Sequence, residues 1–280
     1  MKKAGLILGI LFLTQIAFCQ TAISITKTGT GNPIIFLPGF TSPGSVWDET
    51  ILNLDGAYEI HVISYAGFNG LEPIGTPWYT PIKEQLLDYI QKEKLSNLTL
   101  VGHSMGGNLA TEIAAVLADD LTGLILVESI PCMRELMMPG VPASSLQYDS
   151  PYNNQMLSMK DEAFEQMALG MAQNMTTVAA KMKVLAGWSV KADRETYVYG
   201  YTDLLKLDLR PSLSEITTQT LILGASFPDK EIVKDNYEKQ YANLSNKKII
   251  IAEDSKHFIM FDQPGWLTKQ INKYLTENVQ

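Results

Sequence analysis

The 280-residue sequence predicts an α/β fold, in which a mostly parallel sheet is flanked by helices and carries an inserted helical cap. Two observations support this prediction. Short continuous apolar runs, typical of strands buried on both faces, alternate with amphipathic stretches of helical period. The alternation stops once, over residues 131–210, where the pattern is helical throughout. Strands that alternate with helices along a chain form a parallel sheet with right-handed crossovers.

Six apolar runs are the expected strands, and each ends near a glycine or a polar turn residue. They lie at residues 34–37, 59–65, 98–102, 124–127, 220–224 and 248–251. Between the runs, apolar residues recur at three- and four-residue spacing, which places them on one face of a helix. This spacing is clearest at residues 82–90, 109–117 and 266–275.

Residues 131–210 are expected to form a cap over the carboxyl edge of the sheet, with residues 20–130 and 211–280 as the core domain. Nine of the twelve methionines lie between Met133 and Met182. Methionine fills irregular gaps in cores and also builds adaptable binding surfaces. The cap methionines therefore form either a helical core or an apolar roof for an acyl or aromatic group. Four residues of the core domain are expected to add aromatic surface near the mouth of the substrate site, namely Phe40, Trp47, Tyr65 and Phe68.

The N-terminus, residues 1–19, is expected to be a secretory signal peptide. Two lysines precede an apolar run of about fifteen residues, which is short for a membrane span. Ala17 and Cys19 place small residues before a cut at Gln20. A lipoprotein anchored through Cys19 is less favoured, because Phe18 is large for that signal. No second long apolar run follows, so we expect a periplasmic or secreted protein without stable membrane insertion.

The composition excludes several classes of function. The formal net charge is −8 and no cluster of lysine and arginine is present, so nucleic acid is not an expected partner. Two cysteines and three histidines do not supply a disulfide framework or a four-ligand zinc site. Neither a metal nor an organic cofactor is therefore expected, and the chemistry has to come from few residues.

Ser104 is the candidate nucleophile. It is the central residue of a G-x-S-x-G motif, Gly102 to Gly106, between an expected strand and an expected helix. A sharp strand-to-helix turn forces the serine into strained backbone geometry and leaves no room for side chains two residues before and after it. Such a turn exposes the serine hydroxyl above the sheet.

His257 is the expected general base. It follows the last expected strand and precedes the last expected helix, and sites in α/β proteins lie in loops at the carboxyl ends of strands. The other two histidines suit structural roles. His61 lies within a strand and is expected to be a satisfied core or edge residue. His103 precedes Ser104 on the tight turn and is expected to point away from the hydroxyl, in a packing role.

These motifs resemble the α/β-hydrolase superfamily, in the capped single-domain form common among bacterial serine hydrolases. The resemblance rests on Leu37-Pro38-Gly39-Phe40, on the Gly102–Gly107 turn, and on His257-Phe258 followed by Asp262-Gln263-Pro264. It covers nearly all of the chain after the N-terminal segment. It implies a mostly parallel α/β-hydrolase sheet flanked by helices and a serine, acid, histidine order along the chain.

The resemblance also implies acyl transfer as the reaction. His257 would take the proton of Ser104, which attacks a carbonyl carbon, and water would release the acyl-enzyme. The oxyanion would contact the backbone N–H groups of Phe40 and Met105. The family often has His-Gly where Pro38-Gly39 stands, but a backbone donor tolerates that difference.

The acid of the triad has two candidates. The family usually places an aspartate about three residues after the glycine that ends the penultimate strand, and from Gly224 that position is Phe227. Asp229 lies two residues later, whereas another branch of the family implies Glu128, at the end of the strand after the nucleophile helix. Asp229 could instead be a helix N-cap, and Glu128 could hold a loop. We favour Asp229.

The sequence therefore predicts an exported serine hydrolase that cleaves a carboxylic ester or a related acyl bond of a small, partly apolar substrate. Related alternatives are an aminopeptidase- or amidase-like enzyme and an acyltransferase- or haloperoxidase-like enzyme. The aminopeptidase would need an acidic cluster, for which Glu128, Glu135 and Asp161 are available. A non-catalytic pseudo-hydrolase that binds a small ligand is the alternative from another class.

Overall fold

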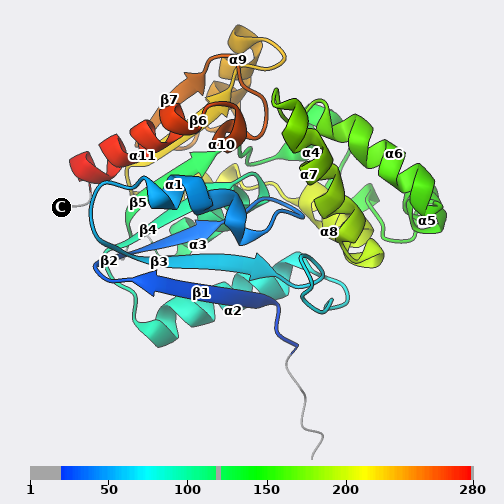
Figure 1. Ribbon diagram of the computed structural model, residues 1–280, viewed down its shortest axis with the longest axis horizontal. Helices are drawn as coiled ribbons and strands as arrows, with labels where there is room; N and C mark the ends of the chain where they lie inside the picture. The colour runs from blue at the N-terminus through cyan, green and yellow to red at the C-terminus, as the bar shows by residue number, and fades with distance from the viewer. Residues whose placement is uncertain (1–19, 118–120, 279–280) are drawn as a thin grey trace, which may run out of the picture.

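A seven-stranded sheet forms the centre of the computed structural model, which describes residues 20–117 and 121–278 (Figure 1). The signal peptide predicted at residues 1–19 lies outside the described residues. The strand order is β1-β3-β2-β4-β5-β6-β7, and β1 alone runs antiparallel to its neighbour. The strands are β1 (Ile23–Gly29), β2 (Asn32–Leu37), β3 (Tyr58–Tyr65), β4 (Leu98–His103), β5 (Leu121–Val127), β6 (Thr220–Ala225) and β7 (Lys247–Ala252). The six predicted runs fall within β2 to β7, so the mostly parallel sheet is confirmed.

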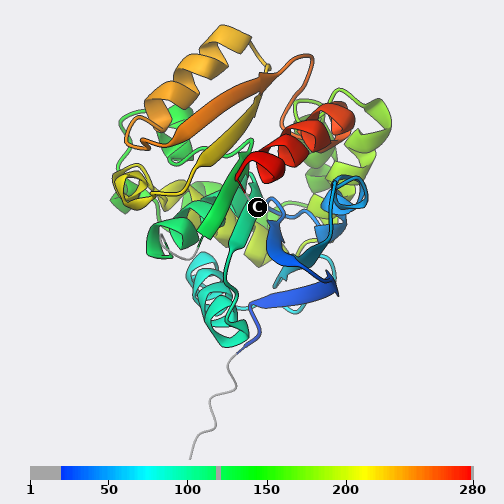
Figure 2. The same ribbon diagram turned by 90° about the vertical axis from the view of Figure 1, so that its left-hand side faces the viewer.

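Helices cover both faces of the sheet (Figure 2). One face packs against α1 (Asp48–Leu52) and α11 (Pro264–Asn278), and the other against α2 (Tyr79–Glu93), α3 (Met105–Val116) and α9 (Lys230–Gln240). Because successive strand residues point to opposite faces, each buried strand contributes to two cores. Phe36 belongs to the core with α11, and Leu37 belongs to the core with α2 and α3.

Residues 131–210, which we call the cap, lie between β5 and β6 and are helical. The cap contains α4 (Met133–Met137), α5 (Pro151–Ser158), α6 (Asp161–Ala172), α7 (Ala179–Lys191) and α8 (Arg194–Lys206). Figure 1 shows these helices together at one end of the sheet, on the opposite side from the C-terminus. Nowhere in the described chain is a helix both long and apolar enough to cross a lipid bilayer.

Asp203 of α8 fastens the cap to the core. Its buried carboxylate accepts hydrogen bonds from the backbone N–H groups of Trp78 and Tyr79, at 2.8 and 3.2 Å, where α2 begins. It also accepts from the hydroxyl of Tyr148 in the cap. An anion at a helix N-terminus pairs N–H groups that have no partner within the helix and complements the helix dipole. This contact holds α8 beside the carboxyl edge of the sheet.

Candidate active site

Ser104 lies at the turn between β4 and α3. Its backbone angles are φ 54° and ψ −121°, a strained conformation for a residue with a side chain. The turn is closed by two hydrogen bonds of 2.9 Å, from the N–H of Ser104 to the carbonyl of Val127 and from the N–H of Gly107 to the carbonyl of Ser104. The strand, turn and helix that the motif predicts are present in the structure.

Close packing explains the glycines of this turn. A Cβ on Gly102 would lie 2.3 Å from the carbonyl oxygen of Gly106, and a Cβ on Gly106 would lie 2.2 Å from that of Leu37. Gly39, on the facing loop, would place a Cβ 3.2 Å from the Cβ of Ser104. The absence of side chains therefore lets the loop after β2 approach the serine closely.

His257 pairs with Glu128. The Oε2 atom of Glu128 lies 3.2 Å from Nδ1 of His257. Glu128 directly follows β5 and His257 lies in the loop after β7, so the sheet order brings the two residues together. A carboxylate only accepts hydrogen bonds, so Nδ1 carries the proton and Nε2 is left as an acceptor. The imidazole is 29% exposed, and the carboxylate is 16% exposed.

The other oxygen of Glu128 is also held. Oε1 accepts hydrogen bonds from the backbone N–H of Ala225 at 2.6 Å and from the hydroxyl of Tyr237 at 3.0 Å. Burial, and next the charge of Glu128, raise the pKa of Tyr237 well above its usual value, so its hydroxyl remains a donor. The carboxylate is thus fixed by three partners from three different segments.

Asp229 is engaged elsewhere, which corrects the preference stated from the sequence. Its side chain caps α9 and accepts hydrogen bonds from the N–H groups of Glu231 and Ile232, both at 3.0 Å. After β6 the chain soon enters this helix, and the carboxylate nearest to the family position, Asp229, caps the helix. The acid beside His257 is Glu128, the alternative candidate, and Asp229 has the N-cap role also considered for it.

His103 supports the loop that carries His257. Its Nε2 atom donates to the backbone carbonyl of His257 at 3.0 Å, and the two rings lie 4.7 Å apart. Burial lowers the pKa of His103 well below its usual value, and the neighbouring His257 adds to this effect, so the ring stays neutral. The residue has the buried packing position expected for it. His61 is buried as well and contacts the Tyr89 hydroxyl at 2.6 Å and Glu59 at 2.9 Å.

Asp262 joins the cap to the same loop. Its Oδ2 atom accepts from the backbone N–H of Lys256, at 2.8 Å, one residue before His257. Its Oδ1 atom accepts from the Thr176 hydroxyl and from the backbone N–H of Thr177, at 2.9 Å, between α6 and α7. A single carboxylate therefore fixes the cap relative to His257.

Ser104 and His257 open into a cavity of about 430 Å³ between the core and the cap. This volume lies within the usual range for small-molecule sites. Its wall is mostly apolar, and none of the described residues that line it is Asp, Glu, Lys or Arg. The larger side chains that line it are Phe40, Met105, Met133, Met137, Met171, Met175, Leu185, Trp188, Tyr197, Tyr201, Leu204 and Phe258. Across the described residues, no group of three or more His, Cys, Asp or Glu side chains is placed to hold a metal ion.

The expectation about aromatic residues near the mouth is correct only for Phe40. Trp47, Tyr65 and Phe68 are at most 1% exposed and belong to the cores of the sheet. The aromatic wall comes instead from α7 and α8 of the cap and from Phe258. Four cap methionines line the cavity, while others, such as Met156, pack inside the cap. The roof for an acyl or aromatic group stays a prediction for those four.

Phe40 and Met105, the expected oxyanion donors, both line the cavity beside Ser104. Met105 is the first residue of α3, so its N–H is among the four that have no partner within the helix. Within the described residues, the N–H of Phe40 donates to no other group. The structure therefore leaves two backbone donors free at the nucleophile.

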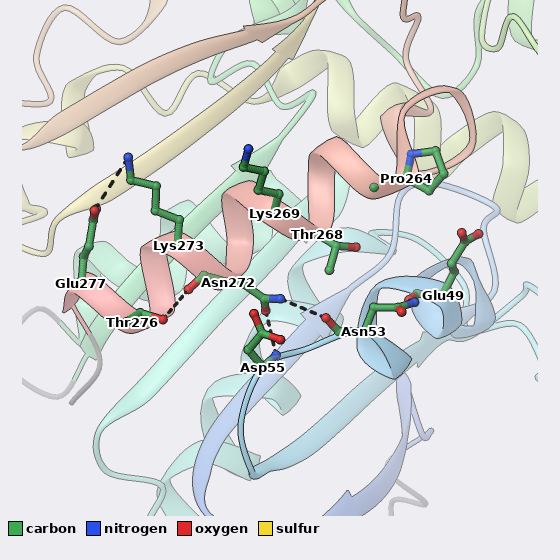
Figure 3. Close-up of a pocket in the computed structure, with 11 residues that line it drawn as sticks. Glu49, Asn53, Asp55, Pro264, Thr268, Lys269, Asn272, Lys273, Thr276 and Glu277 are labelled. Carbon is green, nitrogen blue, oxygen red and sulfur yellow. Dashed lines mark hydrogen bonds and ion pairs between the residues drawn. The ribbon is translucent and has the colours of Figure 1, made fainter.

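A wider and more open groove of about 660 Å³ lies between α1 and α11 (Figure 3). Asn272 crosses it, with a bond of 2.9 Å to the carbonyl of Asn53 and one of 3.0 Å from the N–H of Asp55. Its lining includes no serine, cysteine or histidine and shares no residue with the cavity at Ser104. The groove is therefore separate from the cavity that Ser104 and His257 line.

Comparisons with known proteins identify the family and the fold of this chain. Residues 34–270 match the alpha/beta hydrolase family. The pimeloyl-[acyl-carrier protein] methyl ester esterase of Wigglesworthia glossinidia brevipalpis is 23% identical over 245 residues, which cover 86% of this chain and 93% of that protein. Among solved structures, an esterase from Exiguobacterium antarcticum has a TM-score of 0.75 at 21% identity, with 91% of this chain and 95% of that chain covered. A bromoperoxidase from Bacillus anthracis has a TM-score of 0.73 at 17% identity over the same shares. At these identities the solved structures show a shared fold alone, but the family match spans most of the sequence, and the protein belongs to the alpha/beta hydrolase family.

Proposed function

We propose that the protein is a serine hydrolase that cleaves carboxylic esters through Ser104, His257 and Glu128. The observation that carries this proposal is the pairing of His257 with Glu128 in the same cavity as the strained Ser104 turn. A nucleophile, a base and a group that orients the base are the parts that acyl transfer requires.

In the first half of the reaction, the Ser104 hydroxyl gives its proton to Nε2 of His257 as its oxygen attacks the ester carbonyl carbon. Glu128 accepts from Nδ1–H, which keeps the ring in the useful tautomer and stabilises the imidazolium. The N–H groups of Phe40 and Met105 stabilise the oxyanion. The imidazolium then protonates the leaving alcohol, and the acyl group remains on Ser104.

In the second half, His257 takes a proton from water, and the resulting hydroxide attacks the acyl-serine. The tetrahedral intermediate uses the same two N–H donors. Its collapse returns the proton from His257 to Ser104 and releases the carboxylic acid. The ester and one water are the only reactants consumed, and the alcohol and the carboxylic acid are the products.

The cavity favours neutral, partly apolar esters. Because its wall has no Asp, Glu, Lys or Arg side chain, a charged substrate group inside would lose its hydration without gaining a counter-ion. The cap methionines and Trp188 instead offer apolar surface to an acyl or alcohol chain.

The geometry argues against the aminopeptidase alternative. The acidic cluster that would bind an amino terminus is not formed, because its three candidates are engaged separately. Glu135 pairs with Arg210 at 3.6 Å, Asp161 pairs with Arg194 at 3.1 Å, and Glu128 pairs with His257.

The proposal is tested by labelling and by a substrate panel. We expect a fluorophosphonate to modify Ser104, no labelling of Ser104→Ala, and hydrolysis of short-chain p-nitrophenyl esters but not of amino-acid p-nitroanilides. Folded protein that does not react with the fluorophosphonate would instead indicate a non-catalytic binding protein. Cleavage of the anilides alone would indicate an amidase.

We further propose that residues 1–19 direct export, on the strength of their sequence pattern alone. The full chain, expressed in a bacterial host with an outer membrane, should yield a periplasmic or secreted protein that begins at Gln20. Mass spectrometry that finds Met1 retained, or a lipid on Cys19, would contradict this proposal.

A further inference from the structure

Two tyrosines of α8, Tyr197 and Tyr201, are one helical turn apart and share one wall of the cavity. Their rings lie 5.7 and 5.9 Å from the ring of Phe40, whose backbone N–H is a proposed oxyanion donor. Residues four apart project from the same helix face, so both side chains approach the same part of the cavity.

Both hydroxyls lie against methionine sulfur rather than oxygen. The hydroxyl of Tyr197 is 3.9 Å from Sδ of Met171, and that of Tyr201 is 3.5 Å from Sδ of Met137. A thioether is a weak acceptor, so neither donor has a strong partner. Burial raises the pKa of Tyr197 to about 12 and that of Tyr201 above its usual value, and both phenols therefore stay protonated.

Two other polar side chains near the cavity are paired with oxygen. The side-chain amide of Asn108, which also lines the cavity, donates to the carbonyl of Ile130 at 2.9 Å. Tyr148 of the cap donates to the carboxylate of Asp203. A tyrosine of this cap can thus reach an oxygen acceptor, whereas the hydroxyls of Tyr197 and Tyr201 contact sulfur.

We propose that the hydroxyls of Tyr197 and Tyr201 form a second polar site, which binds a neutral acceptor oxygen of the substrate away from the scissile carbonyl. This inference rests on the proposed esterase function. A ketone, ether or second ester oxygen accepts a hydrogen bond better than a thioether does, and the flexible methionine side chains can move aside for it. When the substrate is a plain alkyl ester, the hydroxyls stay on the sulfurs, so such esters are accepted but not preferred.

The test uses pairs of p-nitrophenyl-type esters in which one methylene is replaced by an ether oxygen, at successive positions of the acyl chain and, separately, of the alcohol. The quantity compared is the ratio of kcat/KM for the ether to kcat/KM for the alkyl ester. At one position at least, this ratio should be about three- to tenfold higher in the wild type than in the Tyr197→Phe/Tyr201→Phe variant, as the loss of a neutral hydrogen bond predicts.

Tyr199→Phe is the matched control, since Tyr199 lies between the two on α8, outside the cavity, with its ring 5.4 Å from that of Tyr148. It should leave the ratio unchanged. Binding is measured separately with the inactive variant Ser104→Ala, through the fluorescence of Trp188. The affinity for the ether ester is divided by that for the alkyl ester, once with Tyr197 and Tyr201 and once with both replaced by Phe.

The inference is overturned if every position gives the same ratio with and without the two hydroxyls, in turnover and in binding alike. If the protein hydrolyses esters and the ratios are the same with and without the two hydroxyls, the second polar site is refuted and the proposed function stands. If the protein hydrolyses no ester but binds the ether more tightly only when the two tyrosines are present, the second polar site is supported and the proposed function is refuted.

Discussion

The turn that carries Ser104 and the cap that covers it face one cavity and are built in opposite ways. At the turn, glycines pack against backbone atoms, and a carboxylate, Glu128, is fixed by three partners. The cap wall is made largely of thioethers and aromatic rings, and among the described residues two of its hydroxyls contact sulfur. Rigid backbone geometry thus positions Ser104, whereas adaptable side chains line the cavity.

The glycines offer the strongest test of this contrast. Gly106→Ala should lower the free energy of unfolding by about 3 kcal/mol, because the new Cβ would lie 2.2 and 2.5 Å from the carbonyl oxygens of Leu37 and Pro38. Gly187→Ala in α7 should raise it by about 0.5–1 kcal/mol, since no atom lies within 4 Å of the added Cβ and alanine favours a helix. Urea denaturation measures the free energy of unfolding of both variants. Equal changes in the two variants would contradict the contrast between the turn and the cap.

Asp262 connects the cap to the loop that carries His257, and the effect of its substitution should be intermediate. Asp262→Asn replaces an acceptor by a donor among three donors, so we expect a loss of about 1–3 kcal/mol in unfolding free energy and about a tenfold loss in kcat/KM. Thermal unfolding and ester hydrolysis give the two values. Asp254→Asn, exposed on the same loop, is the control and should change neither. Lower stability with full kcat/KM would show that Asp262 does not position His257.

Substitution of a cap methionine should have the smallest effect. Met171→Leu conserves volume in the cavity wall, so kcat/KM for plain alkyl esters should change less than about threefold. Met156→Leu, which lies inside the cap, is the matched control for cap stability. If kcat/KM fell tenfold or more in Met171→Leu but not in Met156→Leu, the cap wall would be as rigid as the turn.

The parallel strands were predictable because each one is a continuous apolar run buried on both faces. The edge strand β1 was not predicted, since it is mostly exposed and its Thr and Lys residues interrupt the apolar pattern. Ser104 and His257 could be identified from local context, because a tight turn and a loop at a strand end each leave a short sequence signal.

The acid and the cavity wall could not be settled locally. Glu128 becomes the partner of His257 only through the order of β5, β6 and β7, a long-range property of the sheet. Asp229 occupies nearly the expected position along the chain but is taken by the start of α9. The contribution of Tyr197 and Tyr201 depends on how α8 packs, which the hydrogen bonds of Asp203 help to fix.

The most direct test of the central claim, that Glu128 orients His257 as the base for Ser104, compares Glu128→Gln with Asp229→Asn on one p-nitrophenyl ester. Glu128→Gln should lower kcat/KM roughly 10³- to 10⁴-fold, because the amide favours the wrong tautomer of His257. Asp229→Asn should stay within about threefold of the wild type, since asparagine caps a helix as well as aspartate does. Near-wild-type activity of Glu128→Gln, or an equal loss in Asp229→Asn, would contradict the account.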